Sequence, residues 1–198
     1  RYDVASRLGP FVVDPCIQAG STSVMPFVFS YLAVPDQDGS LQPDLAEKWA
    51  YDKMSFEWTF YLRKDARFHD GRPVTAKDFA FSLKANMALL LPELLARIQS
   101  MDTVSDTALR IRLSRNDPEF LEKIWDIEIF QTPPDMGQPP VEFLIGSGPF
   151  LLKEKSIHRI VLEANSAYYR GRPAIDGMIF TFVPDQEKIW IRLMGGQS

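Results

Sequence analysis

The chain has 198 residues, of which 45% are hydrophobic and 12% aromatic, so it can bury the core of one large or two small domains. Its net charge of −4 at pH 7 comes without any block of like charge, which argues against a nucleic-acid-binding protein, in which a basic patch is expected. No stretch approaches the roughly 20 apolar residues of a membrane span, and the single cysteine, Cys16, cannot form an internal disulfide.

The N-terminal part predicts a helix. Ser21 is a candidate cap for a helix that reaches Leu32. Because Pro26 lies within this window, we expect the regular part of the helix to start near Met25. Phe29 and Leu32 are then expected to face the core.

Two elements are predicted between residues 41 and 62. Pro43 suits the first turn of a helix, and the apolar residues that follow it up to Trp49 recur at helical spacing, which predicts a short amphipathic helix over residues 43–49. From residue 56 to residue 62 apolar and polar side chains alternate, which predicts a strand with one buried face. Tyr61 is expected to be half exposed.

A tight turn and a capped helix follow. His69-Asp70-Gly71 predicts a turn, because Gly71 tolerates a positive φ angle that other residues resist. Thr75 is placed to cap a helix, and Asp78, three residues later, can reach back to the N–H group of the cap. The face of this helix that is expected to be buried carries Phe79, Leu83 and Met87.

The same signals predict further elements downstream. Alternating apolar side chains indicate strands, and a proline at a first helical position marks a helix start. The predicted elements are a strand over 109–113; a helix beginning at Asp117-Pro118 with Phe120, Leu121 and Ile124 inward; a strand over 127–130; strands over 150–152, 159–162 and 178–183; and a last helix that Asp185 caps and that carries Ile189, Trp190 and Leu193.

Short strands alternating with helices make α/β the fold class. Two stretches rich in turn-forming residues divide the chain, 36–40 and 133–148, and the second holds four prolines and three glycines, as expected of a stiff connector between domains. We therefore expect one discontinuous unit, residues 1–40 with 141–198, interrupted by a second unit over residues 41–140.

Three patterns in the sequence suggest chemistry, and each has a simpler structural interpretation. His69, His158 and Cys16 are too scattered for the close ligand spacing of a structural metal site. His69-Asp70 has no accompanying Ser or Cys nucleophile, so we interpret it as part of a turn and expect no catalytic residues. Residues 146–148, Gly-Ser-Gly, lack the Lys-Ser/Thr of a phosphate loop and precede a proline, so we expect a close-packed turn. No cofactor is expected.

Four segments resemble the family 5 extracellular solute-binding proteins, the oligopeptide, dipeptide and nickel receptors of ABC importers. They are PDLAEKW at 43–49, WTFYLRKDARFHDGRPVTAKDFAFSL at 58–83, GSGPF at 146–150 and NSAYYRGRPAIDGMIFTFVPD at 165–185. In the last segment Ser166 and Tyr169 stand where the family pattern has Pro and Trp. The order and approximate spacing of the segments agree with the family, and the resemblance covers nearly the whole chain from Asp14 onward.

This resemblance implies a periplasmic-binding-protein-like fold of type II and a binding role, not catalysis. The chain would be the substrate-binding component of an ABC importer, trapping a peptide, a nickel chelate, an oligosaccharide or an opine between two lobes and delivering it to a permease with its ATPase. The resemblance implies a periplasmic or extracellular location, with membrane contact only through the permease or an upstream lipid anchor. Because family members are more than twice as long, we expect an N-terminal fragment without the second lobe, from which any signal peptide has been removed.

The candidate ligand-binding residues are Gln18, Ala19, Gly20 and Ser21. They follow a predicted buried strand over residues 11–13, which ends at Asp14-Pro15 because proline restricts the residue before it. They lead into the predicted helix, whose free N–H groups can receive a carboxylate or a carbonyl oxygen. The resemblance implies that this segment lines the cleft and contacts the ligand backbone; the alternative is a helix start at the surface. Trp49, Trp58 and Phe68 are expected in the core.

Two other functions remain open from the sequence. A cytoplasmic transcriptional regulator can carry the same binding fold behind a DNA-binding domain, and a winged-helix sequence upstream of Arg1 would favour it. An enzyme is the weaker alternative, since it needs a paired acid and base in the cleft.

Overall fold

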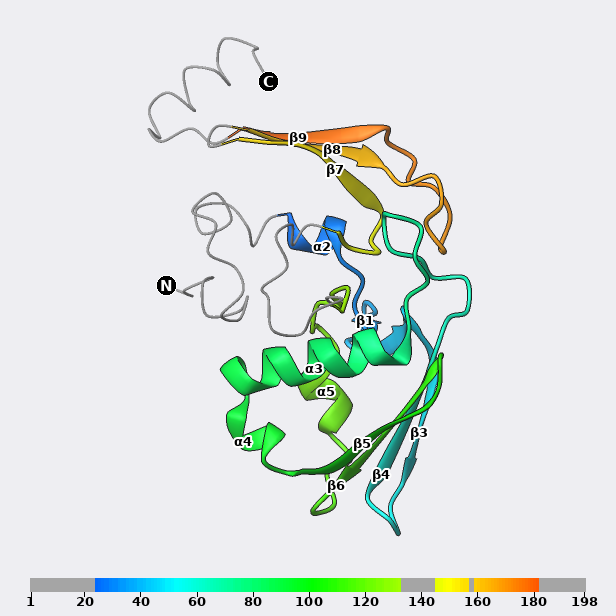
Figure 1. Cartoon of the computed structure of the whole chain (residues 1–198), viewed down its shortest axis with the longest axis vertical. Coiled ribbons are helices and arrows are strands. Elements are labelled where there is room, and N and C mark those ends of the chain that lie inside the picture. Colours follow the sequence, from blue (N-terminus) through cyan, green and yellow to red (C-terminus); the bar gives the residue numbers. More distant parts are fainter. Residues whose placement is uncertain (1–23, 133–144, 157–158, 182–198) are drawn as a thin grey trace.

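A computed structural model of the chain describes residues 24–132, 145–156 and 159–181, and it has the expected α/β class. Two antiparallel sheets and a small hairpin carry the strands, and the helices are short except for α3 (Figure 1). In chain order the elements are α2 (Met25–Val28), β1 (Ala33–Pro35), β2 (Leu41–Pro43), β3 (Ala46–Asp52), β4 (Glu57–Leu62), α3 (Ala76–Leu90), α4 (Pro92–Leu95), β5 (Ile98–Ser105), β6 (Ala108–Leu113), α5 (Phe120–Ile124), β7 (Phe150–Lys155), β8 (Arg159–Ala164) and β9 (Gly177–Thr181).

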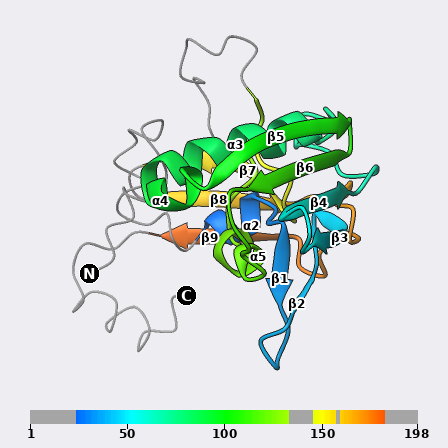
Figure 2. The same cartoon turned by 90° about the horizontal axis from the view of Figure 1, so that it is seen from below.

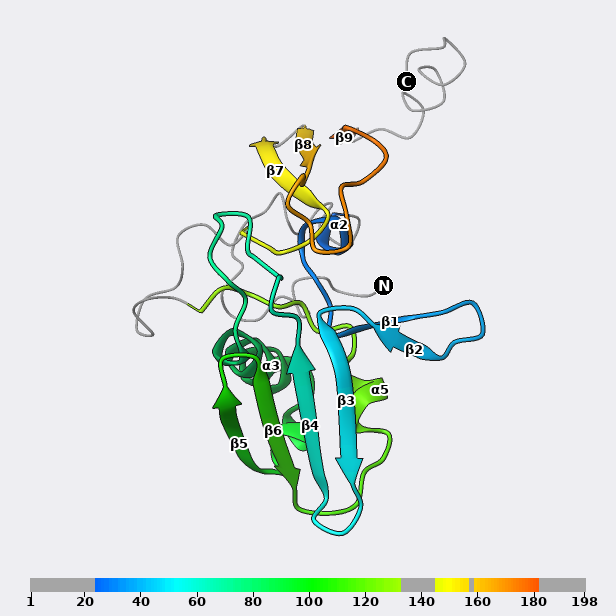
Figure 3. The ribbon, with the colours of Figure 1, turned by 90° about the vertical axis from the view of Figure 1, so that its right-hand side faces the viewer.

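The larger sheet has the strand order β3-β4-β6-β5, and α3, α4 and α5 lie on one of its faces (Figures 1 and 3). The predicted alternation is confirmed in β4 and β6, where every second side chain is buried against these helices. Aromatic rings fill the space between the layers: the Trp58 ring stacks on Phe60 at 5.8 Å, and Phe60 meets Phe79 edge to face at 5.6 Å. Trp58 and Phe68 are therefore core residues, as predicted, and Trp49 packs half-buried against the same cluster.

The helix predicted over residues 43–49 is wrong, because most of this segment forms β3. In the pairing of β3 with β4, Ala46 lies opposite Leu62 and Lys48 opposite Tyr61, so Glu47 is an extra residue that forms a bulge. The bulge shifts the alternation by one residue, which places Ala46 and Trp49 on the same face of the sheet. Residues three apart also share one face of a helix, which is why the sequence predicted a helix here.

The capped helix is confirmed as α3. The Thr75 hydroxyl accepts a hydrogen bond from the Asp78 N–H, and the Asp78 carboxylate accepts one from the Thr75 N–H, so both halves of the capping box are present. The predicted inward residues Phe79, Leu83 and Met87 are fully buried. Gly71 has a φ angle of +87° in the turn that precedes the helix, as predicted for that glycine.

The smaller sheet has the order β7-β8-β9, and α2 packs against one of its faces (Figure 1). All three strands were predicted, with shorter or shifted bounds. Together these elements bury a second hydrophobic cluster, made of Val24, Met25, Val28, Phe29, Phe130, Phe150, Ile160, Leu162 and Ala164. The turn-rich stretch 36–40 is the loop of the β1-β2 hairpin, which projects from the body in Figures 2 and 3.

The helix predicted to reach Leu32 starts near Met25, as expected, but it ends at Val28. Phe29 has an extended backbone with a ψ angle of 154°, because the chain here leaves the smaller cluster for the larger one. Phe29 and Leu32 are both buried, as predicted, but in different clusters. The strand predicted over residues 127–130 is also wrong: this buried segment runs between the clusters and belongs to no sheet.

Some predictions concern residues outside the described ranges. These are the strand over 11–13, Cys16, the candidate ligand residues Gln18, Ala19, Gly20 and Ser21, His158, most of the 133–148 connector and the last helix from Asp185. Within the described ranges, no helix is both long and apolar enough to cross a membrane.

Candidate functional site

Three segments that connect the two hydrophobic clusters lie side by side, and we call them the junction: residues 28–32, 129–132 and 145–149. The Gly148 N–H donates to the Val28 carbonyl oxygen at 2.9 Å, and the Ser30 hydroxyl donates to the Ser147 carbonyl oxygen at 2.9 Å. The Ile129 N–H donates to the Ser30 carbonyl oxygen at 3.3 Å. The junction is therefore a hydrogen-bonded crossing of chain segments that are distant in sequence, and it adjoins α2, into which the candidate ligand segment leads.

Two glycines let the junction pack this closely. A Cβ atom on Gly146 would lie 1.8 Å from the Val28 carbonyl oxygen, and one on Gly148 would lie 2.7 Å from the Val28 carbonyl carbon. Real Cβ contacts are never this short, so only glycine fits at either position. The predicted close packing is thus confirmed for residues 146–148, but the predicted turn is wrong, because residues 146 and 147 form no turn and the chain only bends at residue 148.

The Gly148 carbonyl oxygen is the meeting point of three parts of the chain. His69 Nε2 lies 3.1 Å from this oxygen, and Asn165 Nδ2 donates to it at 3.1 Å. Because a carbonyl oxygen only accepts, His69 carries its proton on Nε2, and Nδ1 of the neutral ring has a free lone pair. Nδ1 is buried and has no hydrogen-bond partner among the described residues. Burial lowers the pKa of His69 below its ordinary value of 6.5, although the bond to Gly148 and the charge of Asp70 oppose this.

This geometry makes stability depend on pH. The free energy of unfolding is expected to fall as the pH drops below 6.5. In this range His69 binds a proton in the unfolded chain but not in the folded protein, where its pKa is lower. The loss ends once the pH is below the folded-state pKa. Urea unfolding at several pH values should show a smaller loss for His69→Gln, whose side-chain amide donates to Gly148 without titrating. An equal loss in the variant and the wild type would contradict this assignment.

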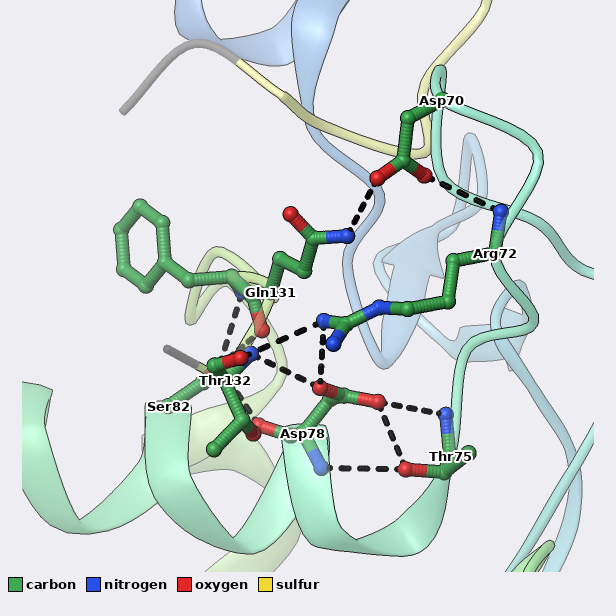
Figure 4. Close-up of polar contacts among 8 residues, drawn as sticks. Asp70, Arg72, Thr75, Asp78, Ser82, Gln131 and Thr132 are labelled. Carbon is green, nitrogen blue, oxygen red and sulfur yellow. Dashed lines mark hydrogen bonds and ion pairs between the residues drawn. The ribbon is translucent and has the colours of Figure 1, made fainter. Parts of the chain in front are cut away.

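A second polar group links α3 to the junction (Figure 4). The Asp78 carboxylate is buried and accepts hydrogen bonds from the N–H groups of Thr75 at 2.9 Å and Thr132 at 2.8 Å. It also accepts a bond from the Thr75 hydroxyl, and the Arg72 guanidinium lies at 3.4 Å. Asp78 therefore both caps α3 and holds the end of the 129–132 segment.

A third group ties the loop after β8 to the loop before β3. The buried Asp44 carboxylate accepts a hydrogen bond from the Tyr169 hydroxyl at 3.0 Å and pairs with Arg170 at 3.2 Å. Burial, and then the charge of Asp44, raise the pKa of Tyr169, so its hydroxyl stays protonated and donates. Tyr169 stands where the family pattern has Trp, and both residues carry a hydrogen-bond donor at the rim of an aromatic ring.

The contacts of Asp70 do not fit a catalytic pair with His69. The Asp70 carboxylate accepts bonds from the Arg72 N–H and Gln131 Nε2, so it does not orient His69 as the carboxylate of a catalytic pair would. Among residues 24–132, 145–156 and 159–181, no group of three or more His, Cys, Asp or Glu side chains could hold a metal ion.

Sequence reasoning missed several residues that make the long-range contacts described above. It assigned no role to Ser30, Asp44, Thr132 or Asn165, because their partners lie far away in the sequence. Asp44 and Asn165 do fall within segments that carry the family resemblance, and this was the one feature of the sequence that could have pointed to them. The predicted ligand residues at 18–21 lie outside the described residues, so their role stays a prediction.

The described part superposes on solved periplasmic binding proteins of type II, which defines its class. One of them is the oligopeptide-binding protein AppA of Bacillus subtilis in complex with a nonapeptide, with a TM-score of 0.77, 25% identity, and coverage of 94% of this chain and 39% of that chain. The sequence pattern described as "Bacterial extracellular solute-binding proteins, family 5 Middle" matches residues 40–198. The chain belongs to this family.

Curated relatives differ in their ligands and roles. Heme-binding protein A of Haemophilus influenzae is 27% identical over 79% of this chain and 34% of its own length. The HTH-type transcriptional regulator SgrR of Pectobacterium atrosepticum is 30% identical over 80% of this chain and 29% of its own length. The chain thus spans about a third of the length of these relatives.

Proposed function

We propose that the protein is the substrate-binding component of an ABC importer, and that it captures peptides and delivers them to a permease. The observation that carries this proposal is the match of residues 40–198 to the family of extracellular solute-binding proteins. The AppA structure, which holds a nonapeptide and is similar over 94% of the chain, supports peptides as the ligand. In this mechanism two lobes close around the ligand, and the higher affinity of the closed state shifts the population toward it.

The proposed ligand contacts come from Gln18, Ala19, Gly20 and Ser21. This segment shortly precedes α2 in the sequence, and α2 is buried in the hydrophobic cluster of the smaller sheet. Main-chain groups near a helix start offer the same donors and acceptors to every peptide, which suits a receptor that tolerates many sequences.

The proposed domain division is a discontinuous lobe, residues 1–40 with 141–198, and an inserted subdomain, residues 41–140. Its support is the existence of two separate hydrophobic clusters. One draws its buried residues from 32 to 129, and the other from 24 to 29, Phe130 and 150 to 164. In this division the inserted subdomain carries the sheet of β3 to β6, and the lobe carries the proposed ligand residues, 18–21.

A transport assay tests the peptide proposal. Deleting the gene is expected to abolish uptake of radiolabelled trialanine, and calorimetry on the product of the complete open reading frame is expected to show that the product binds this peptide. Gly20→Val should weaken binding about tenfold, or by about 1.4 kcal/mol, because a side chain there blocks approach to the backbone. Gln37→Val, in the exposed β1-β2 loop, is the control and should bind as the wild type does. Unchanged uptake in the deletion strain, together with no binding of peptides from two to nine residues, would refute the proposal.

The second candidate function is a solute-sensing domain of a cytoplasmic transcriptional regulator. The relative that favours it is SgrR, an HTH-type transcriptional regulator that is 30% identical over 80% of this chain. A DNA-binding domain encoded upstream of Arg1 would decide for the regulator, and a signal peptide or lipoprotein cysteine there would decide for the importer.

A further inference from the structure

We propose that His69 and Asn165 are positioning residues, which act through Gly148 to hold α2, the helix that follows the proposed ligand residues in the sequence. The functional part of this inference rests on the proposed function, because it is there that residues 18–21 are proposed to contact the ligand. The placement of α2 itself rests only on the described contacts.

Helix α2 cannot hold its own position. It has four residues, its N-cap residue Val24 makes no side-chain capping bond, and it contains a proline. Helices this short are not stable without tertiary contacts, since nucleation costs more than one turn returns. The location of α2 must therefore be set by what it touches.

Helix α2 makes a close backbone contact at its C-terminal end. The Val28 carbonyl oxygen receives the Gly148 N–H, and the backbones of Gly146 and Gly148 press against this same carbonyl group without room for a Cβ atom. The Phe27 ring also packs edge to face on Phe150, at 6.0 Å between the ring centroids. Since backbone atoms do not adopt new rotamers as side chains do, a shift of Gly148 must move α2 with it.

Gly148 is in turn fixed from two directions. His69, in the turn before α3, and Asn165, after β8, donate to the same carbonyl oxygen and so occupy both of its lone pairs. Asn165 is itself oriented, because its side-chain oxygen accepts the Ala167 N–H at 3.0 Å. The two side chains belong to the two different parts of the molecule, so the position of α2 depends on how those parts meet.

A merely structural role would make a different prediction from a positioning role. If these side chains only stabilise the fold, removing either donor should raise amide exchange throughout the molecule. If they position α2, the amides of Phe27, Val28 and Phe29, which bond to Val24 and Met25, should lose protection selectively.

Hydrogen exchange measured by mass spectrometry on the product of the complete open reading frame distinguishes these roles. Asn165→Asp keeps the side-chain oxygen but loses the donor to Gly148, and His69→Leu removes the other donor. Both are expected to speed exchange in residues 24–30 about tenfold relative to β4 and β6, and His69→Gln, which restores a donor, should return to wild-type rates. Lys123→Met removes the ion pair with Asp117 in the inserted unit, so it lowers stability without touching the junction.

The outcomes separate the two claims. Unchanged exchange in residues 24–30, or the same acceleration in Lys123→Met, would overturn the positioning of α2. If the wild type binds trialanine and neither Asn165→Asp nor His69→Leu changes its affinity, the claim that these residues affect ligand binding through α2 is overturned. If the wild type binds no peptide while the local exchange changes as expected, the proposed function fails and the positioning of α2 is supported.

Discussion

Gly146→Ala is expected to lower the free energy of unfolding by about 4 kcal/mol, because the added methyl group has no space to occupy. The new Cβ atom would lie 1.8 Å from the Val28 carbonyl oxygen and 3.2 Å from the Phe29 Cα atom. Both neighbours are backbone atoms at the end of α2, so relief requires moving the junction itself. Urea unfolding followed by tryptophan fluorescence measures the loss.

Two other glycines provide the controls. Gly39→Ala tests backbone strain without steric crowding, because Gly39 has open space around it but a φ angle of +83°. The expected cost is about 1 kcal/mol. Gly148→Ala should fall between the two, since its shortest contact is 2.7 Å. If Gly146→Ala proves no more costly than Gly39→Ala, the close packing described for the junction is wrong.

Asp78→Ala is expected to lower the free energy of unfolding by about 3 kcal/mol, because one carboxylate serves two structures. Loss of the capping box costs about 1 kcal/mol. The Thr132 N–H is left without its acceptor, and an unsatisfied buried donor costs about 2 kcal/mol more. The carboxylate is buried, so solvent cannot easily replace these bonds. Chemical denaturation gives the total, and loss of exchange protection at Thr132 shows the second part.

The two roles of Asp78 are separable by a milder change. Thr75→Ala removes the hydroxyl from the cap but leaves the Asp78 bond to the Thr132 N–H intact, so it should cost about 1 kcal/mol. Asp102→Ala, at an exposed carboxylate on β5, should change stability by less than about 0.5 kcal/mol. A loss in Asp78→Ala no larger than in Thr75→Ala would show that Asp78 is only a cap.

The elements set by local pattern could be predicted from the sequence. The strands β4 and β6 follow from their alternation, and α3 follows from Thr75 and Asp78 with three inward side chains at helical spacing. The failures came where a local pattern had two physical causes. The three-residue spacing of Ala46 and Trp49 arises from a bulge as readily as from a helix, and only the partner strand decides between them.

The junction could not be predicted because its contacts join residues far apart in the sequence. Ser30 bonds to Ser147 across 117 positions, and His69 reaches Gly148 across 79 positions. The motifs at 69–71, 146–150 and 165–169 could be quoted as a resemblance, but nothing in the sequence alone shows that His69, Gly148 and Asn165 meet. The proposed ligand residues, 18–21, remain a prediction.

The large separation of Ser30 and Ser147 in the sequence also affects the order in which parts of the molecule fold. During synthesis α2 leaves the ribosome long before the glycines that hold it, so its first environment is solvent. Closing a flexible loop of this size costs conformational entropy that grows with the logarithm of its length. The strands β3 to β6 pair mostly between chain neighbours, and once they fold, the Leu32 N–H reaches the Trp125 carbonyl oxygen at 3.2 Å. This contact brings the two ends of the β3 to α5 region together, so the loop that remains to be closed between α2 and its glycines is much shorter than the 117 positions that separate Ser30 from Ser147.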